Sequence, residues 1–204
     1  MPERVLMLIL NYAPQTDAAH ALWLAEQALH SGVNWLTLRV RDLPARMALD
    51  MALQLRRLTR TAGALLGINP YPALAEWCEA DAIHLPEHAP PYLPPTPMWL
   101  GRSAHSVESA QRAAAEGCHY LLVGTMYPTA SHPGKPPEGI PLLRAVHAAV
   151  PLPLIAVGGI TPERVSECLE AGARGIAVIS GIADAPDPAE AARQYAAAVF
   201  GTTP

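Results

Sequence analysis

The chain has 204 residues, of which half are hydrophobic and 16% are Asp, Glu, Lys or Arg. A chain of this length suits one domain with a substantial core, and it lies near the lower limit for an α/β barrel. The formal net charge of −4 and the lack of any Lys and Arg cluster argue against nucleic acid or another polyanion as a partner.

The N-terminus and the cysteines indicate the compartment. The apolar run at residues 5–10 is too short to span a bilayer, and its flanks lack the charge pattern of a signal peptide. Cys78, Cys118 and Cys168 are far apart and form no C-x-x-C motif, which is typical of reduced structural thiols. We therefore expect a cytoplasmic protein that does not bind a membrane.

Short apolar runs recur along the whole chain. Near-continuous hydrophobicity over a few residues is typical of strands that are covered on both faces. We therefore expect a strand at each run. The runs are residues 4–10, 35–40, 64–69, 82–86, 98–104, 120–126, 154–160 and 175–182.

Most segments between these runs carry helix signals. N-capping residues or an early proline open them, and Gly32 and Gly63 follow the ends of the first two. The segment at residues 87–97 is too rich in proline for a regular helix, so we expect an irregular crossover there. The predicted helix starts are Asp17, Pro44, Ser106, Thr161–Pro162 and Asp187–Pro188.

The alternation of strands and helices predicts a single-domain TIM (β/α)8 barrel over residues 1–204. An open doubly wound sheet is the alternative. Such sheets usually have about five to seven strands, and no G-x-G-x-x-G motif follows the first predicted strand.

In a TIM barrel the functional site lies at the C-terminal ends of the strands, so the residues after each run are the candidates. Polar and small residues occur at most of these ends, and together they predict one polar mouth. The candidates are Arg39, Arg41, Asn69, His84, Glu87, Ser103, His105, Gly158, Gly159, Ser180 and Gly181, with the loop at residues 123–139 after the sixth run.

The last two strand ends predict a phosphate site. Gly158 and Gly159 expose backbone N–H groups before a helix that starts at Thr161, and Ser180 and Gly181 follow the neighbouring strand. Phosphate sites in barrels are commonly built from these two loops. The alternative is a glycine-lined turn without a ligand.

Arg39 and Arg41 lie on the same side of an extended segment, with Val40 opposite. Two guanidinium groups at a strand end can bind an anion in a bidentate manner. The alternative is one surface ion pair with Asp42 and one solvated arginine.

His84 and His105 can act as general acids or bases, because imidazole titrates near neutrality. The alternative is that each is a hydrogen-bonded wall residue. His84, Glu87 and His88 also resemble a metal cluster, but the loop around Pro86 leaves their spacing undefined, so we predict no metal site made by protein alone.

Four motifs, in order along the chain, resemble the thiamin phosphate synthase superfamily, and most closely its TenI branch, which includes thiazole tautomerases. The resemblance implies a TIM barrel and a role in thiamin metabolism. It also implies that a small-molecule thiazole phosphate binds at Gly158, Gly159, Ile179 and Ser180. The motifs are GRSAHS (101–106), VGTMYPT (123–129), IAVGGITPERV (155–165) and GIAVISGIADAPDPAEAARQYA (175–196).

The chain departs from the synthase branch where that branch holds a pyrimidine diphosphate. The second strand of the synthases ends in a sequence similar to Q-L-R-E-K, and here Thr37, Val40 and Arg41 replace the Gln, the Glu and the Lys. Pro70 and Ala89 stand where the synthases carry two Asp ligands of Mg²⁺. Mg²⁺ usually neutralises a diphosphate leaving group. We therefore expect Mg²⁺ only if the chain is a synthase, and otherwise no cofactor.

The loop after the sixth strand aligns with the synthase loop that reads P-T-x-T-K and closes over phosphates. Thr129 and Ser131 keep its two hydroxyls, and His132 replaces its Lys. Thr125 replaces the His that follows the sixth strand of TenI tautomerases. A tautomerase needs a titratable group near the ring, so His132 is the first candidate, followed by His84 and His105.

Three functions therefore remain open. The leading prediction is a TenI-like thiazole tautomerase, an isomerase. The second is thiamin phosphate synthase, a transferase. The third is a non-catalytic protein that binds thiazole phosphate or thiamin phosphate. The sequence also leaves open whether the chain forms a homodimer.

Overall fold

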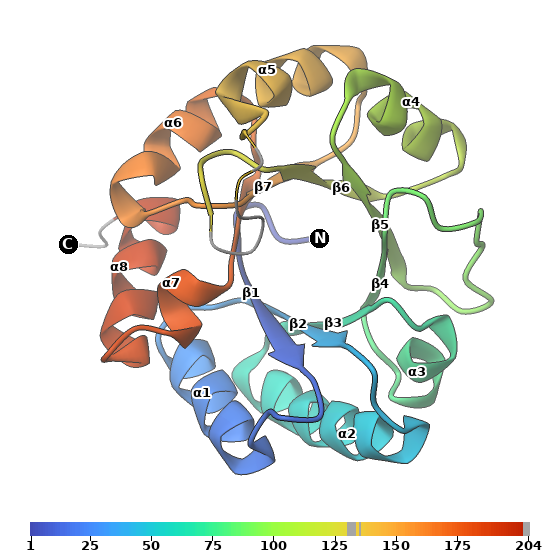
Figure 1. Cartoon of the computed structure of the whole chain (residues 1–204), viewed down its shortest axis with the longest axis vertical. Helices are drawn as coiled ribbons and strands as arrows, with labels where there is room; N and C mark the ends of the chain where they lie inside the picture. Colours follow the sequence, from blue (N-terminus) through green and yellow to red (C-terminus); the bar gives the residue numbers. More distant parts are fainter. Residues whose placement is uncertain (130–133, 135, 202–204) are drawn as a thin grey trace.

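The computed structural model describes residues 1–129, 134 and 136–201 and shows a closed barrel of parallel strands surrounded by helices (Figure 1). Strands pair in chain order, and β1 pairs with β8 to close the ring. Closure excludes the open doubly wound sheet and confirms the predicted TIM barrel. The strands are β1 Val5–Tyr12, β2 Trp35–Val40, β3 Leu65–Asn69, β4 Ala82–Leu85, β5 Trp99–Ala104, β6 Tyr120–Gly124, β7 Leu154–Val157 and β8 Gly175–Val178.

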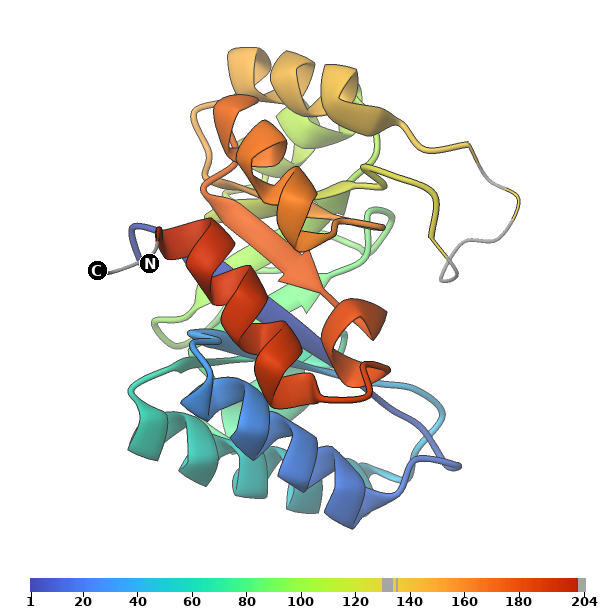
Figure 2. The same cartoon turned by 90° about the vertical axis from the view of Figure 1, so that its left-hand side faces the viewer.

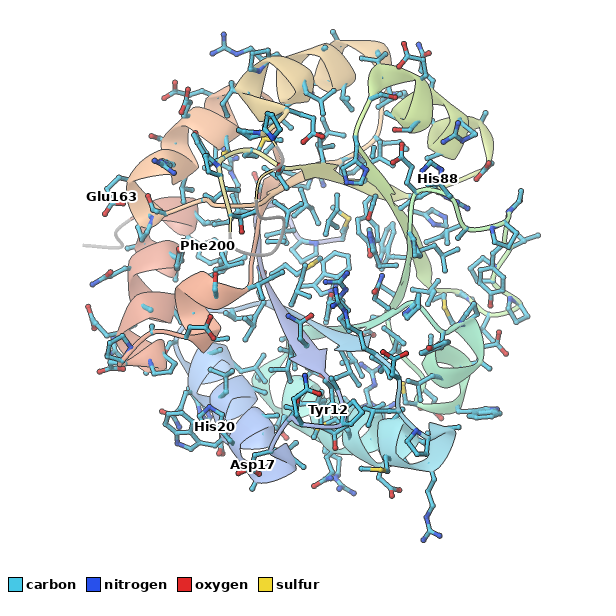
Figure 3. The ribbon with its side chains drawn as sticks, viewed as in Figure 1. Tyr12, Asp17, His20, His88, Glu163 and Phe200 are labelled. Carbon is cyan, nitrogen blue, oxygen red and sulfur yellow. The ribbon has the colours of Figure 1, made fainter. Side chains whose placement is uncertain are left out.

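The outer helices begin at the predicted capping residues. The Asp17 carboxylate, labelled in Figure 3, accepts a hydrogen bond from the N–H of Ala19 at 2.9 Å. The Ser106 hydroxyl accepts one from the N–H of Ser109 at 3.0 Å. These bonds satisfy N–H groups that a helix leaves unpaired. The helices are α1 Ala18–His30, α2 Ala45–Ala62, α3 Pro72–Trp77, α4 Val107–Ala115, α5 Gly139–Ala149, α6 Val165–Glu170, α7 Ser180–Ala183 and α8 Pro188–Phe200, with a 3-10 turn at Pro162–Arg164.

Residues 180–182 differ from the prediction, which placed them in the last strand. They begin α7, because the backbone of Ile179 (φ −118°, ψ −93°) leaves the extended conformation. The apolar run continues there because Ile182 packs into the core between strands and helices. Similarly, β7 ends at Val157, before Gly158 adopts a φ of 103°.

Side chains fill the barrel interior toward the N-terminal ends of the strands. Trp35 and Tyr120 meet there with ring centroids 5.0 Å apart. Gly101 provides the space, since a Cβ at that position would lie 2.0 Å from the Tyr120 ring. Because side chains alternate along a strand, Thr37 and Arg39 face inward above Trp35 on β2. The inward positions near the strand ends are therefore free to line a pocket.

The Pro-rich segment at residues 87–97 forms no helix, as predicted. Arg102 of β5 holds this segment against the barrel, and its side chain is buried with 1% exposure. The guanidinium donates hydrogen bonds of 2.5 to 3.4 Å to four carbonyl oxygens within residues 86–90. It also lies 3.0 Å from the Glu116 carboxylate. The hydrogen bonds of the buried Arg102 therefore fix this crossover, which has no helix to pack against the barrel.

The strand arrows point away from the end of the barrel at which the N-terminus lies (Figure 2). Cys78, Cys118 and Cys168 are buried free thiols, as the sequence predicts. Among the described residues, no helix combines the length and the apolar character that crossing a membrane requires.

Candidate active site

A cavity of about 810 Å³ opens at the C-terminal ends of the strands. Its floor is apolar and includes Met7, Ile9 and Leu122. One wall comes from the loops after β6, β7 and β8, and the other comes from the ends of β2 to β5. We call these the glycine wall and the polar wall. Most of the predicted site residues line this one cavity.

The glycine wall depends on two residues that only glycine suits. Gly158 and Gly159 have φ values of 103° and 63°. A Cβ on Gly159 would lie 2.4 Å from the carbonyl oxygen of Pro128. This close approach lets the chain after β6 run beside β7, where Met126 N–H donates to Val157 O at 3.0 Å. The chain after β6 and the end of β7 therefore lie side by side and form one continuous wall of the cavity.

Backbone N–H groups on this wall are available to an anion. Those of Gly159 and Ser180 donate to no acceptor among the residues that the structure describes. Ile179 and Ser180 also line the cavity, as predicted. Gly159 is partly buried and Ser180 is exposed at the cavity, so both N–H groups can donate to an anion that enters it.

Arg164 adds a positive charge to the glycine wall, and the sequence analysis missed it. Its Nη1 donates to Gly159 O at 3.1 Å, and its guanidinium lies 4.3 Å from the centre of the Tyr127 ring. The Tyr127 hydroxyl in turn donates to Glu167. Contacts with two loops and a helix thus hold this guanidinium at the cavity, where it lines the glycine wall.

The base of the loop after β6 is closed by Glu138. Its carboxylate accepts hydrogen bonds from the N–H of Thr125 at 2.6 Å and from the Thr125 hydroxyl at 3.2 Å. Thr125 and Thr129 line the cavity, as predicted, although the Thr125 hydroxyl is directed to Glu138. Ser131 and His132 lie outside the described residues, so their predicted roles remain predictions.

The polar wall contains one of the two predicted arginines. Arg39 is partly buried and lines the cavity. Burial, with a smaller effect of the Arg41 charge, lowers the pKa of Arg39, which stays a cation because arginine starts so high. Arg41 follows the end of β2 and is exposed, and it does not line the cavity. The predicted pair of arginines is therefore reduced to Arg39.

His84 is a wall residue rather than an acid or a base. It is 5% exposed, and its Nε2 lies 2.9 Å from the Ser103 hydroxyl. Burial, together with the charges of Arg39 and Arg102, lowers the pKa of His84 to about 3. Its Nδ1 and the Thr37 hydroxyl are fully buried and have no hydrogen-bond partner among the described residues.

The pKa of His84 predicts a loss of stability in acid. The unfolded chain takes up a proton at the ordinary histidine pKa of 6.5, whereas the folded chain resists it down to about 3. Stability due to this residue is complete above pH 6.5 and is lost as the pH falls toward 3. At pH 5 the loss is about 2 kcal/mol.

Urea unfolding of the wild type and of a His84→Gln variant at pH 8 and pH 5 measures this effect. Between pH 8 and pH 5, the free energy of unfolding of the wild type is expected to fall by about 2 kcal/mol more than that of the variant. His30→Gln serves as the control, because His30 is exposed at the end of α1. If His84→Gln and His30→Gln changed the pH dependence of the free energy of unfolding equally, the lowered pKa of His84 would be contradicted.

Asn69, Ser103, Glu87 and His105 complete the polar wall. The Asn69 amide donates to the carbonyl oxygen of His84 at 2.8 Å, which fixes its orientation. Glu87 Oε2 lies 2.7 Å from Nδ1 of His105. Burial alone would raise the pKa of Glu87, but hydrogen bonds from His105 and Ser109 hold it below its usual value. Glu87 is therefore an anion at neutral pH.

The described residues of the cavity do not suit a resident Mg²⁺. Glu87 is the one carboxylate among those that line it, and that carboxylate is bonded to His105. Within the described part of the chain, no three His, Cys, Asp or Glu side chains gather as a metal site would require. Mg²⁺ prefers carboxylate oxygen ligands, and the Asp pair of the synthases is Pro70 and Ala89 here.

Comparison with known proteins identifies the family. The family model described as thiamine monophosphate synthase matches residues 6–182. The chain belongs to this family. A thiamine-phosphate synthase of Thermus thermophilus is 36% identical over 203 residues, covering 96% of this chain and 97% of the relative. One of Moorella thermoacetica is 37% identical over 180 residues, covering 85% of each chain.

A solved structure agrees with the family assignment. The thiamine phosphate pyrophosphorylase of Pyrococcus furiosus superposes with a TM-score of 0.81 at 26% identity, covering 97% of this chain and 96% of that one. The predicted superfamily is thus confirmed, and with it a place in thiamin biosynthesis. The named relatives are synthases, so they favour the transferase alternative over the isomerase that the sequence led us to expect.

Proposed function

We propose that the protein is a transferase that joins a pyrimidine carried as its diphosphate ester to a thiazole phosphate. The observation that supports it is that two anion-binding walls face one cavity. Free N–H groups and Arg164 belong to the glycine wall, and Arg39 belongs to the polar wall. A reaction between two phosphorylated substrates needs two such walls, whereas the isomerisation of one monophosphate needs one. The names of the relatives favour the same reaction.

The two substrates would meet over the apolar floor. The thiazole phosphate group binds the N–H groups of the glycine wall, and the diphosphate lies at Arg39. The pyrimidine ring lies against the polar wall, where Thr37 and His84 line the cavity. The thiazole nitrogen then attacks the methylene carbon of the pyrimidine, the C–O bond to the diphosphate breaks, and its electron pair leaves with the diphosphate. The protein contributes positioning and charge stabilisation.

A coupled assay tests the transfer. Purified protein with hydroxymethylpyrimidine diphosphate and thiazole phosphate is expected to release thiamin phosphate and inorganic diphosphate in equal amounts. Arg39→Gln is expected to lower kcat/KM at least about 10-fold, since a charge-assisted hydrogen bond to the diphosphate is lost. Arg41→Gln is the matched control and is expected to change the rate little, because Arg41 lies outside the cavity.

Other outcomes identify the other functions. A non-aromatic thiazole phosphate tautomer that is converted without any coupling would favour the isomerase. Tight binding of thiazole phosphate without either product would favour the non-catalytic binding protein. Equal losses in the Arg39 and Arg41 variants would contradict the proposed position of the diphosphate. Whether the chain forms a homodimer remains a prediction.

A further inference from the structure

The hydrogen-bonded pair Glu87 and His105 lies on the polar wall, close to the position where the synthases have their second Mg²⁺ ligand and this chain has Ala89. His105 follows β5 and lines the cavity, and its Nδ1 is 2.7 Å from the partly buried Glu87 carboxylate. Because Glu87 is an anion, Nδ1 carries the proton of this bond. The other ring nitrogen, Nε2, has no partner among the described residues and is left for a ligand.

The pair is held by its surroundings on both sides. Arg102 donates a hydrogen bond to the backbone carbonyl of Glu87, at 3.3 Å, and so fixes the start of the Pro-rich segment. Ser109 contributes a hydrogen bond to the Glu87 carboxylate and also accepts one from the N–H of His105 at 3.2 Å. A side chain of α4 therefore ties both members together, which a chance surface contact would not require.

The charged and titratable groups that face His105 come from three elements. Glu87 is the nearest, and His88 of the same loop lies 3.8 Å from its carboxylate and is largely exposed at the β4–β5 side of the mouth (Figure 3). Arg102 lies behind them on β5. His84 of β4 is uncharged at neutral pH and cannot donate a proton to a ligand.

We propose that His105 is the general acid for the departing diphosphate, with Glu87 as the residue that positions it. The inference rests on the proposed transfer reaction. As the C–O bond breaks, the electron pair stays on the diphosphate oxygen, and the proton on His105 Nε2 passes to that oxygen. Glu87 stabilises the imidazolium form before the transfer and keeps Nε2 directed into the cavity. The proton then returns to His105 from solvent.

This proton transfer would neutralise part of the negative charge that develops on the departing diphosphate. Departure of a diphosphate concentrates negative charge, which the synthases neutralise with Mg²⁺ held by two Asp. The described residues of this cavity do not suit that ion. A proton from His105 and the fixed charge of Arg39 reduce the same negative charge without it, and proton transfer of this kind contributes about 100- to 10,000-fold to a rate.

The pH profile of coupling tests the proposal. In EDTA, the wild-type rate is expected to fall about tenfold per pH unit on the alkaline side, because the proposed step needs a protonated acid. His105→Gln is expected to lower the rate about 100-fold and to remove that alkaline limb. Glu87→Gln is expected to lower it about 10-fold while keeping the limb at a changed pH. His30→Gln, exposed at the other end of the barrel, is the control and should match the wild type.

Binding of inorganic diphosphate gives a readout apart from turnover. In EDTA at pH 6.5, His105→Gln is expected to bind it about 5-fold more weakly than the wild type, and the difference in affinity is expected to become smaller as the pH is raised. A His105→Gln variant that keeps the wild-type pH profile would overturn the proposal, even if its rate were lower. So would a wild type whose coupling is abolished by EDTA and restored by Mg²⁺. If the wild type forms no thiamin phosphate under any condition, the transferase proposal itself fails.

Discussion

Replacing Arg102 by methionine is expected to lower the free energy of unfolding by about 3–5 kcal/mol, which is the usual cost of removing one partner from a buried ion pair. The guanidinium is almost fully buried and joins four carbonyl oxygens of the segment at residues 86–90 to β5. Methionine fills a similar volume but donates no hydrogen bond. The four carbonyls and Glu116 then lose their partner, and the segment loses its anchor.

Urea unfolding at pH 7 measures this loss. Arg57→Met is the control for the same substitution, because Arg57 is exposed on α2 and makes no ion pair among the described residues, and its change is expected to stay within about 0.5 kcal/mol. A loss below about 1 kcal/mol for Arg102→Met would contradict the anchoring role. Because Glu87 is part of the anchored segment, the variant should also weaken the Glu87–His105 hydrogen bond, which the Nδ1–H signal in proton NMR reports.

Local patterns in the sequence predicted the barrel because they depend on neighbouring residues. Apolar runs, capping residues and glycines recur at each strand and helix, and their order implies closure. The predicted ends of the strands were least accurate where an apolar residue could belong either to the strand or to the following helix. The apolar run through Ile182 continues past the end of β8, because Ile182 packs into the core from α7 instead of from a strand. Periodicity alone does not separate these cases.

The site was predicted in outline for the same reason. Residues at strand ends, such as Arg39 and Asn69, follow from the barrel geometry once the strands are located. Arg41 shows the limit, because β2 ends one residue before it and turns it outward to solvent. Glu138 and Arg164 were missed because their roles depend on contacts between separate loops. For Glu138, an acidic residue directly before α5 was the available signal.

The family relationship and the departures from it are compatible in physical terms. The glycine wall contains Gly158, Gly159, Ile179 and Ser180, where we propose that the thiazole phosphate binds. The polar wall carries Pro70 and Ala89 where the resemblance implies the Mg²⁺ carboxylates, and it places the hydrogen-bonded pair of Glu87 and His105 at the cavity. Enzymes stabilise a leaving group by charge, by metal or by proton transfer, and these are interchangeable in part. The chain can therefore keep the family's reaction while changing how the leaving group is stabilised.

Gly159→Ala is expected to disrupt the glycine wall more than any other single methyl group. A left-handed φ costs alanine about 1–2 kcal/mol, and overpacking against a rigid neighbour costs about 1–3 kcal/mol more. The added Cβ would lie 2.4 Å from Pro128 O and 2.8 Å from Tyr127 O, both of which are backbone atoms. The loop after β6 must then move away from β7. We expect a loss of about 2–5 kcal/mol in stability and at least a 10-fold loss in affinity for thiazole phosphate.

Gly63→Ala separates the two causes, because Gly63 ends α2 with a φ of 67° and has open space where its Cβ would lie. This control carries the same backbone strain without the clash, so it is expected to lose about 1–2 kcal/mol and to bind thiazole phosphate normally. Thermal unfolding and calorimetric titration of both variants give the comparison. Equal stability losses would mean that the contact with Pro128 and Tyr127 contributes nothing. Wild-type affinity in Gly159→Ala would show that the phosphate does not depend on the close approach of these two loops.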